Sequence, residues 1–356
     1  MSASQQSQPG RWKPILLALV LAGLVVWWLG RQAFNWAGFW LALRALDPAW
    51  VAASCLAAIL TYAGRAVRWQ VLIEHARPQA RFWPIFEATV IGFTFSVVLG
   101  RAGEFVRPFL IARSEGLTVG SQVAVWFLER LTDLIAVLIL FGFVLTRFDL
   151  SQANRAGPEV RWILEYGGRA IGALGGVSLA ILLVFRAFSA EAAARVMEGL
   201  ALLPDAWRER LAGVVVAFAD GVEATRQMSV LIRVGLYTIL EWGLIALSFH
   251  GLLRSSPATA HLSFTDTLIV LGFVAFASVL QIPGVGGGAQ VATVVVLTQL
   301  FDVAAEPATA MALLMWIVGF ALVTPLGLVL SAKSGLGFRR VVRAMRGHAP
   351  ARGSGQ

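Results

Sequence analysis

Charged residues and cysteine are both scarce in this sequence. Charged residues make up 14% of its 356 positions and hydrophobic residues 58%, whereas a soluble globular domain has about 25% charged and about 45–50% apolar residues. A water-soluble fold of this length would need more polar surface than the chain can supply. The composition therefore excludes a soluble domain and predicts an all-α polytopic integral membrane protein.

Motifs that carry catalytic or metal chemistry are missing as well. The single cysteine, Cys55, excludes an intrachain disulfide and a cysteine metal cage. The four histidines lack the spacing of metal ligands, and neither a nucleophile elbow nor a Walker phosphate loop occurs. The net charge is +9, but basic and aromatic residues are not interleaved as on a nucleic-acid surface. We therefore expect no cofactor, no metal, no nucleic-acid partner and no ATP-driven pump.

What the chain does have is long apolar runs, six of which approach the ~20 residues needed to cross a bilayer. They lie at about 14–30, 48–64, 119–146, 168–188, 230–252 and 307–331. Two further runs are apolar but interrupted, at about 82–113 by GRAGEFVRP and at about 266–302 by IPGVGGG. Interrupted apolar segments in both halves of a chain are typical of transporters that bind substrate near the membrane midplane.

Arginine in the loops predicts the orientation, because cytoplasmic loops carry the excess of basic residues. Both chain ends are basic and are predicted to be cytoplasmic, whereas residues 302–306 contain two acids and no base. The segment after the second run, predicted to be a cytoplasmic loop, contains Arg65, Arg68, Arg77 and Arg81. These assignments fit six transmembrane helices plus two oppositely oriented re-entrant hairpins. Full crossing of each hairpin as two helices has the same parity and stays open.

The predicted domain organisation follows from these runs. Residues 1–12 form a disordered tail, 13–333 the transmembrane domain and 334–356 a basic cytoplasmic tail. Within the domain, 189–229 has apolar residues at helical spacing and is expected to lie on the cytoplasmic side. This amphipathic stretch fits an interfacial helix on lipid and a helix packed beneath the bundle equally well.

The two interrupted runs share a faint internal similarity. TFSVVLGRAG (94–103) aligns with AFASVLQIPG (275–284), so that Phe95 matches Phe276 and Gly103 matches Gly284. Chance matches are common in low-diversity apolar sequence, and that explanation stays open. In the first tip, glycines let the backbone turn and approach a ligand closely. In the second, exposed amides at a helix start favour an anion, unless the glycines form only a flexible break.

The most informative charges lie inside the run 119–146. Glu129 is about ten residues into the span, so at ~1.5 Å per residue it lies near mid-bilayer. Asp133 lies on the same helical face and three residues after Arg130. Ionisable groups at this depth indicate a functional site or, alternatively, an ion-pair network that only ties helices together. Glu241 falls in mid-segment and is a further candidate, whereas Glu87 lies nearer the cytoplasmic edge.

The candidate substrate-binding residues therefore come from both tips and from the charged helix. They are Arg101, Gly103, Glu104, Arg107, Glu129, Arg130, Asp133, Pro283, Gly284, Gly286, Gly287 and Gln290. The arginines have the fork geometry that suits phosphate or carboxylate. Glu104 is placed to pair with an arginine of its own tip or with Arg130.

These motifs resemble a known family. VLGRAGEFVRPFLIAR, VAVWFLERLTDLIAVL and QIPGVGGGAQVATVVVL, in this order, are similar to the transmembrane flippase region of lysylphosphatidylglycerol synthases and its stand-alone relatives, over roughly 12–333. The resemblance implies a multi-helix membrane fold with re-entrant hairpins that moves modified phospholipids or other lipid carriers between leaflets. The sequence departs from the family pattern at Gly100, where proline is usual, and at Gln290, where an acid is usual. No aminoacyl-transfer domain is expected, so no synthase activity carries over.

The leading hypothesis is a flippase in the cytoplasmic membrane that moves a charged-headgroup lipid or lipid-linked intermediate through a polar groove. Its arginines would hold an anionic headgroup, while the acids balance the site or contact a cationic group. One alternative is a membrane enzyme that modifies a lipid headgroup, with Glu104 or Glu129 as general base. Another is a non-transporting scaffold for a lipid-biosynthesis enzyme, in which the charges are structural.

Overall fold

The computed structural model describes most of the helical bundle. The described residues are 34–147, 173–178, 180, 198, 216, 227–278, 281–282 and 286–333. The predicted first span, most of the span 168–188, almost all of the amphipathic stretch 189–229 and both tails lie outside them. Among the described residues, the regular elements are helices apart from two strands of two residues each.

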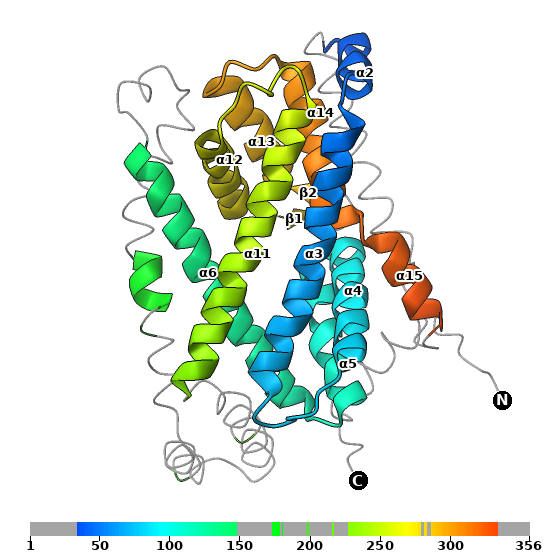
Figure 1. The fold of residues 1–356 in the computed structure, drawn as a ribbon, viewed down its shortest axis with the longest axis vertical. Helices are drawn as coiled ribbons and strands as arrows, with labels where there is room; N and C mark the ends of the chain where they lie inside the picture. Colours follow the sequence, from blue (N-terminus) through cyan, green and yellow to red (C-terminus); the bar gives the residue numbers. More distant parts are fainter. Residues whose placement is uncertain are drawn as a thin grey trace, which may run out of the picture.

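Three long helices form the frame: α3 (Pro48–Ile73), α6 (Val119–Arg147) and α11 (Met228–Ser255). α3 and α11 run antiparallel, side by side along most of their length (Figure 1). At one end the Asp47 amide donates to the Ser255 carbonyl (2.8 Å), and at the other Arg233 pairs with Glu74 (2.7 Å). α3 begins at Pro48 because the Asp47 side chain caps its first turn and proline is tolerated at the first helical position.

The first interrupted run forms a helical hairpin. It consists of α4 (Phe82–Leu99), the 3₁₀ turn η1 (Gly100–Phe105) and α5 (Val106–Glu115). Gly100 has φ +64°, a conformation that glycine adopts without strain. α4 follows α3 after a short loop and α5 ends just before α6, so both open ends lie at the same end of the bundle (Figure 1).

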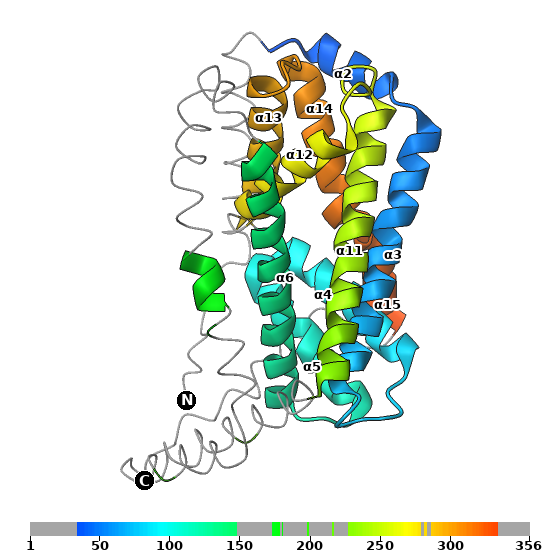
Figure 2. The ribbon, with the colours of Figure 1, turned by 60° about the vertical axis from the view of Figure 1, so that its left-hand side comes forward.

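The second interrupted run forms a hairpin that points the other way. It consists of α12 (Phe264–Ala277), the strands β1 (Gln281–Ile282) and β2 (Gly286–Gly287), and α13 (Gly288–Gln299). α12 starts with a capping box between Ser263 and Asp266. The first hairpin occupies the lower half of the bundle and the second the upper half (Figures 1 and 2). Their tips meet where β1 lies against η1.

The last described segment connects the two hairpins. α14 (Ala305–Trp316) packs on α13, and α15 (Thr324–Lys333) packs on α4. Between them lies η3 (Ile317–Ala321), a π-helical stretch. The short helix α2 (Trp36–Arg44) packs on α14 near the start of that helix.

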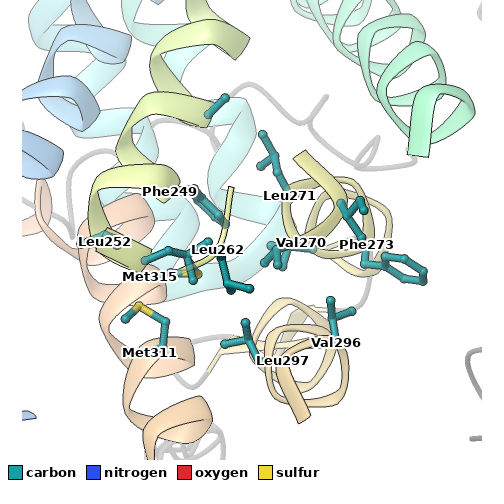
Figure 3. Close-up of a cluster of buried hydrophobic side chains, with 14 of the residues drawn as sticks. Phe249, Leu252, Leu262, Val270, Leu271, Phe273, Val296, Leu297, Met311 and Met315 are labelled. Atoms are coloured by element: carbon teal, nitrogen blue, oxygen red, sulfur yellow. The ribbon is translucent and has the colours of Figure 1, made fainter. Parts of the chain in front are cut away.

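Two apolar cores stabilise the halves. One packs α12, α13 and α14 against α11 through residues such as Phe249, Val270, Leu297, Met311 and Met315 (Figure 3). The other packs α4 and α5 against the parts of α3, α6 and α11 that lie beside the first hairpin, with Trp69 and Phe95 fully or almost fully buried. The ionic residues described below lie among these apolar surfaces.

Four helices of the described part are long and apolar enough to cross a membrane: 48–73, 82–99, 228–255 and 305–333. α6 is equally long but carries Glu129, Arg130 and Asp133. The predicted all-α membrane fold is confirmed, and the predicted runs starting at 48, 119, 230 and 307 are helices. One prediction is wrong: Arg65 and Arg68 do not lie in a loop, since α3 continues to Ile73.

Candidate functional site: a buried charge network

Seven ionisable side chains from four helices meet inside the bundle, and we call this set the charge network. Its members are Arg65 and Arg68 of α3, Arg107 of α5, Glu129, Arg130 and Asp133 of α6, and Glu241 of α11. Charged groups away from water are costly unless each is paired. The contacts below show how the pairing is achieved.

Arg68 is the centre of the network. Its guanidinium lies 2.8 Å from Glu129 and 2.7 Å from Asp133, and its side chain is 0% exposed. Glu241 lies 3.3 Å away, and the hydroxyl of Thr238 accepts a further hydrogen bond at 3.1 Å. Arg68 thereby joins α3 to two other helices. Glu129 and Asp133 belong to α6, and Glu241 and Thr238 belong to α11.

Arg107 brings the first hairpin into the network. Its guanidinium donates to Glu129 (2.8 Å) and to the backbone carbonyl of Arg65 (3.0 Å). It also lies 4.2 Å from the centre of the Trp69 ring, a cation–π contact. Trp69 is held in turn by a hydrogen bond from its indole nitrogen to Gln122 (2.8 Å). α5 is therefore fixed to α3 and α6 by directional contacts.

Close packing of α4 on α5 positions Arg107. A Cβ atom at Gly92 would lie 2.6 Å from the Arg107 Cβ, so only glycine allows the two helices to approach this closely. Burial of the arginine among apolar residues then requires the ionic partners described above.

Arg65 forms the second arm of the network. Its Nε lies 2.6 Å from Glu241, and its guanidinium lies 4.4 Å from the centre of the Phe93 ring and 5.7 Å from that of Tyr62. Arg65 and Arg68 are three residues apart and so share one face of α3. This spacing lets both contact Glu241 on the antiparallel helix α11.

Arg130 forms the more accessible edge. Its side chain is 35% exposed and lies 3.3 Å from Asp133 and 3.7 Å from Glu129. Asp133 is 15% exposed, and Glu104 of the first tip lies close enough to interact electrostatically with Arg130. Arg130 and Asp133 form the ion pair of the network, among the described contacts, in which both side chains are partly exposed. This pair also lies beside a hairpin tip.

The structure places the remaining first-tip candidates as follows. The backbone of Arg101 lies in η1. A Cβ at Gly103 would lie 2.2 Å from the carbonyl oxygen of Phe95, so this glycine allows η1 to pack on the backbone of α4. The predicted close approach at Gly103 is thus made to the hairpin's own helix.

The second tip is built from glycine and a helix cap. Gly286 and Gly287 form β2, which pairs antiparallel with β1, and Gly287 has φ +152°. The side chain of Gln290 accepts a hydrogen bond from the Gly287 amide (2.7 Å) at the start of α13. One of the amides that the sequence offered to an anion is therefore already satisfied. Pro283 and Gly284 lie outside the described residues.

Arg65 and Arg68 are the functional candidates that sequence reasoning missed as site residues. Both end an apolar run and precede further arginines, which is the pattern of a cytoplasmic loop. The available signal was the absence of any helix breaker before Pro78 and the return of apolar residues from Trp69 to Ile73. Glu241, by contrast, is a candidate on its mid-segment position in the sequence, and it joins the network.

Within the described part of the chain, no three His, Cys, Asp or Glu side chains are grouped to hold a metal ion. The network instead offers guanidinium and carboxylate groups, which bind charged organic groups by hydrogen-bonded ion pairs.

The chain matches the family described as Lysylphosphatidylglycerol synthase TM region over residues 15–327. No curated protein and no solved structure matches it. With its apolar helices, the match identifies a multi-pass membrane protein. The match covers most of the 356 residues. The chain therefore belongs to the family of lysylphosphatidylglycerol synthase TM regions, in the form of a transmembrane domain.

Proposed function

We propose that the protein is a lipid flippase of the cytoplasmic membrane that moves a charged-headgroup lipid or lipid-linked intermediate between leaflets. The observation that carries this proposal is the partly open edge of the charge network, Arg130 and Asp133 beside Glu104. A guanidinium at this edge suits the phosphate of a headgroup, and the carboxylates suit a cationic group. The lipid tails would stay in the bilayer.

The arrangement of the hairpins supports alternating access. Each hairpin has both open ends at one end of the bundle, and the tips meet at β1 and η1. As re-entrant hairpins, they would enter the membrane from opposite sides. Irregular backbone such as η1 and the β1–β2 turn is tolerated at membrane depth where protein or a water-filled cavity covers it. Movement of one tip at a time would open the network first to one leaflet and then to the other.

The test is leaflet exchange in proteoliposomes. The purified protein is reconstituted with a panel of headgroup-labelled lipids, and the label accessible from outside is followed over time. We expect wild-type protein to accelerate exchange of at least one lipid and Arg130→Gln to slow it about tenfold or more. The matched control is Arg233→Gln, since Arg233 is similarly exposed but pairs with the exposed Glu74 outside the network. Equal rates for wild type, Arg130→Gln and protein-free vesicles across the panel would contradict the proposal.

The complete burial of Arg68 and Glu129 favours a second candidate, a non-transporting scaffold for a lipid-biosynthesis enzyme. In that case the charges would only tie helices together. A scaffold is expected to copurify with a stoichiometric partner and to give no exchange. A headgroup-modifying enzyme would instead change the mass of a lipid supplied in the vesicles, and we expect no such change.

A further inference from the structure

The segment 305–333 is a single apolar stretch, yet it is not one regular helix. The amide of Leu322 donates to the carbonyl of Ile317 (2.7 Å), a bond over five residues that defines the π-helical turn η3. Pro325, four residues after the end of η3 (Ala321), has no amide hydrogen. A regular α-helix would lose the bond to the Ala321 carbonyl there, and the proline ring would clash with that carbonyl. The regular helix is therefore interrupted between α14 and α15, and we call this interruption the joint.

The two sides of the joint belong to different hairpins. Before η3, α14 packs on α13 through the core that contains Met311 and Met315 (Figure 3). After η3, Gly327 of α15 is pressed against α4, where a Cβ would lie 2.0 Å from the Thr94 hydroxyl oxygen. Movement of one hairpin relative to the other must therefore pass through η3 or break one of these packed surfaces.

Tyr62 of α3 connects this joint to the charge network. Its hydroxyl donates to the carbonyl of Gly319, in the middle of η3, at 3.2 Å, and the residue is buried. Its ring lies 5.7 Å from the Arg65 guanidinium and makes an edge contact with Phe93 of α4 (5.2 Å between centres). One side chain thus contacts η3, the first hairpin and the Arg65 arm.

We propose that η3 is a hinge between the two hairpins and that Tyr62 is the positioning residue that latches it in the state described. The hydrogen bond to Gly319 holds the hinge, while the ring packs beside Arg65. A change of partners at Arg65 displaces Tyr62 and releases the hinge. The hinge follows from geometry alone, and its coupling to lipid movement rests on the proposed function.

The test uses Tyr62→Phe, which removes the hydroxyl and keeps the ring. Spin labels are placed at Leu313 on α14 and Leu328 on α15, both exposed, in full-length protein with Cys55→Ser, reconstituted in lipid nanodiscs. The distance distribution between the labels reports the bend at η3. We expect one narrow distribution for the latched protein and a second population for Tyr62→Phe. Loss of one neutral hydrogen bond is expected to change the ratio of states about fivefold.

Two further variants make the outcome decisive. Tyr237→Phe, a partly buried tyrosine of α11 outside the network, should leave the distribution unchanged. Pro325→Ala should restore a regular helix, give a single longer distance and slow leaflet exchange several-fold. Identical distributions for wild type and Tyr62→Phe would overturn the latch, and an unchanged distribution for Pro325→Ala would overturn the hinge, whatever the exchange rates are. A changed distribution with no exchange by any variant would keep the hinge and reject transport.

Discussion

Both hairpins pack through an apolar core, but among the described residues only the first is also held by ion pairs. The first carries Arg107, which pairs with Glu129 and stacks on Trp69, so ion pairs and a cation–π contact fix it. The second contains no charged residue between Asp266 and Asp302. It is held by apolar packing around Leu297 (Figure 3). Ionic contacts are directional and tied to particular partners, whereas apolar contacts are not. We therefore expect the first hairpin, rather than the second, to take part in the proposed recognition of charge.

The largest effect is expected from Glu129→Gln. This carboxylate contacts both Arg68 and Arg107, and it is fully buried. Its loss leaves the buried Arg107 without an ion-pair partner among the described residues, whereas Arg68 keeps Asp133 and Glu241, so we expect a destabilisation of about 3–5 kcal/mol. Thermal unfolding in detergent, followed by tryptophan fluorescence, measures the change. The control, Glu74→Gln, breaks an exposed pair and should change the stability by less than about 1 kcal/mol. Equal unfolding temperatures for both variants would show that ion pairs do not hold the first hairpin.

A smaller loss is expected when the apolar hairpin is disturbed. Leu297→Ala removes a fully buried side chain from α13, and the resulting cavity should cost about 2–4 kcal/mol. The same unfolding assay applies, with the exposed Leu313→Ala as its control. High salt should leave this loss unchanged. A loss no greater than that of Leu313→Ala would show that apolar packing is not what holds the second hairpin.

Gly103→Ala tests the charged tip without removing a charge. The new methyl group would lie within 2.2 Å of the Phe95 carbonyl oxygen, and such overpacking should cost about 1–3 kcal/mol. Gly235→Ala on α11 is the matched control, since nothing lies within 4 Å of its Cβ position. That control should be neutral or slightly stabilising because alanine favours a helix over glycine. Equal effects of the two substitutions would contradict the tight packing of η1 on α4.

The smallest effect is expected at the glycine-rich tip. Gln290→Ala removes the side chain that accepts from the Gly287 amide at the start of α13, which should cost about 0.5–2 kcal/mol. Gln290→Glu retains an acceptor at this position and should stay close to wild type. If Gln290→Glu were as destabilising as Gln290→Ala, the cap would not be the source of the effect.

Local patterns in the sequence predicted the helical elements well. The run beginning at 48 starts at the observed residue because Asp47 and Pro48 form a strong start signal. The interruptions at GRAGEF and PGVGGG mark the observed tips because glycine breaks helices at both. Asp133 contacts Arg130 in the structure, a pair that the spacing within one helix made visible.

The site could be predicted only in part, because its pairing is between helices. Arg68 meets Glu129 from 61 residues away and Thr238 from 170 residues away, and no local pattern encodes such contacts. An arginine that follows an apolar run gives the same sequence pattern in two cases. The helix either ends there, or it continues and pairs the arginine with an acid on another helix. The assignment of Arg65 and Arg68 to a loop failed for this reason.

The central claim is that the open edge of the charge network binds a charged lipid headgroup, and retained lipids test it most directly. Wild type, Arg130→Gln and Arg233→Gln are purified from the same membranes in mild detergent, and their bound lipids are quantified by mass spectrometry against the total membrane lipid. We expect one headgroup class to be enriched on wild type and on Arg233→Gln, and to fall about tenfold on Arg130→Gln. The same lipid profile on all three proteins would contradict the claim.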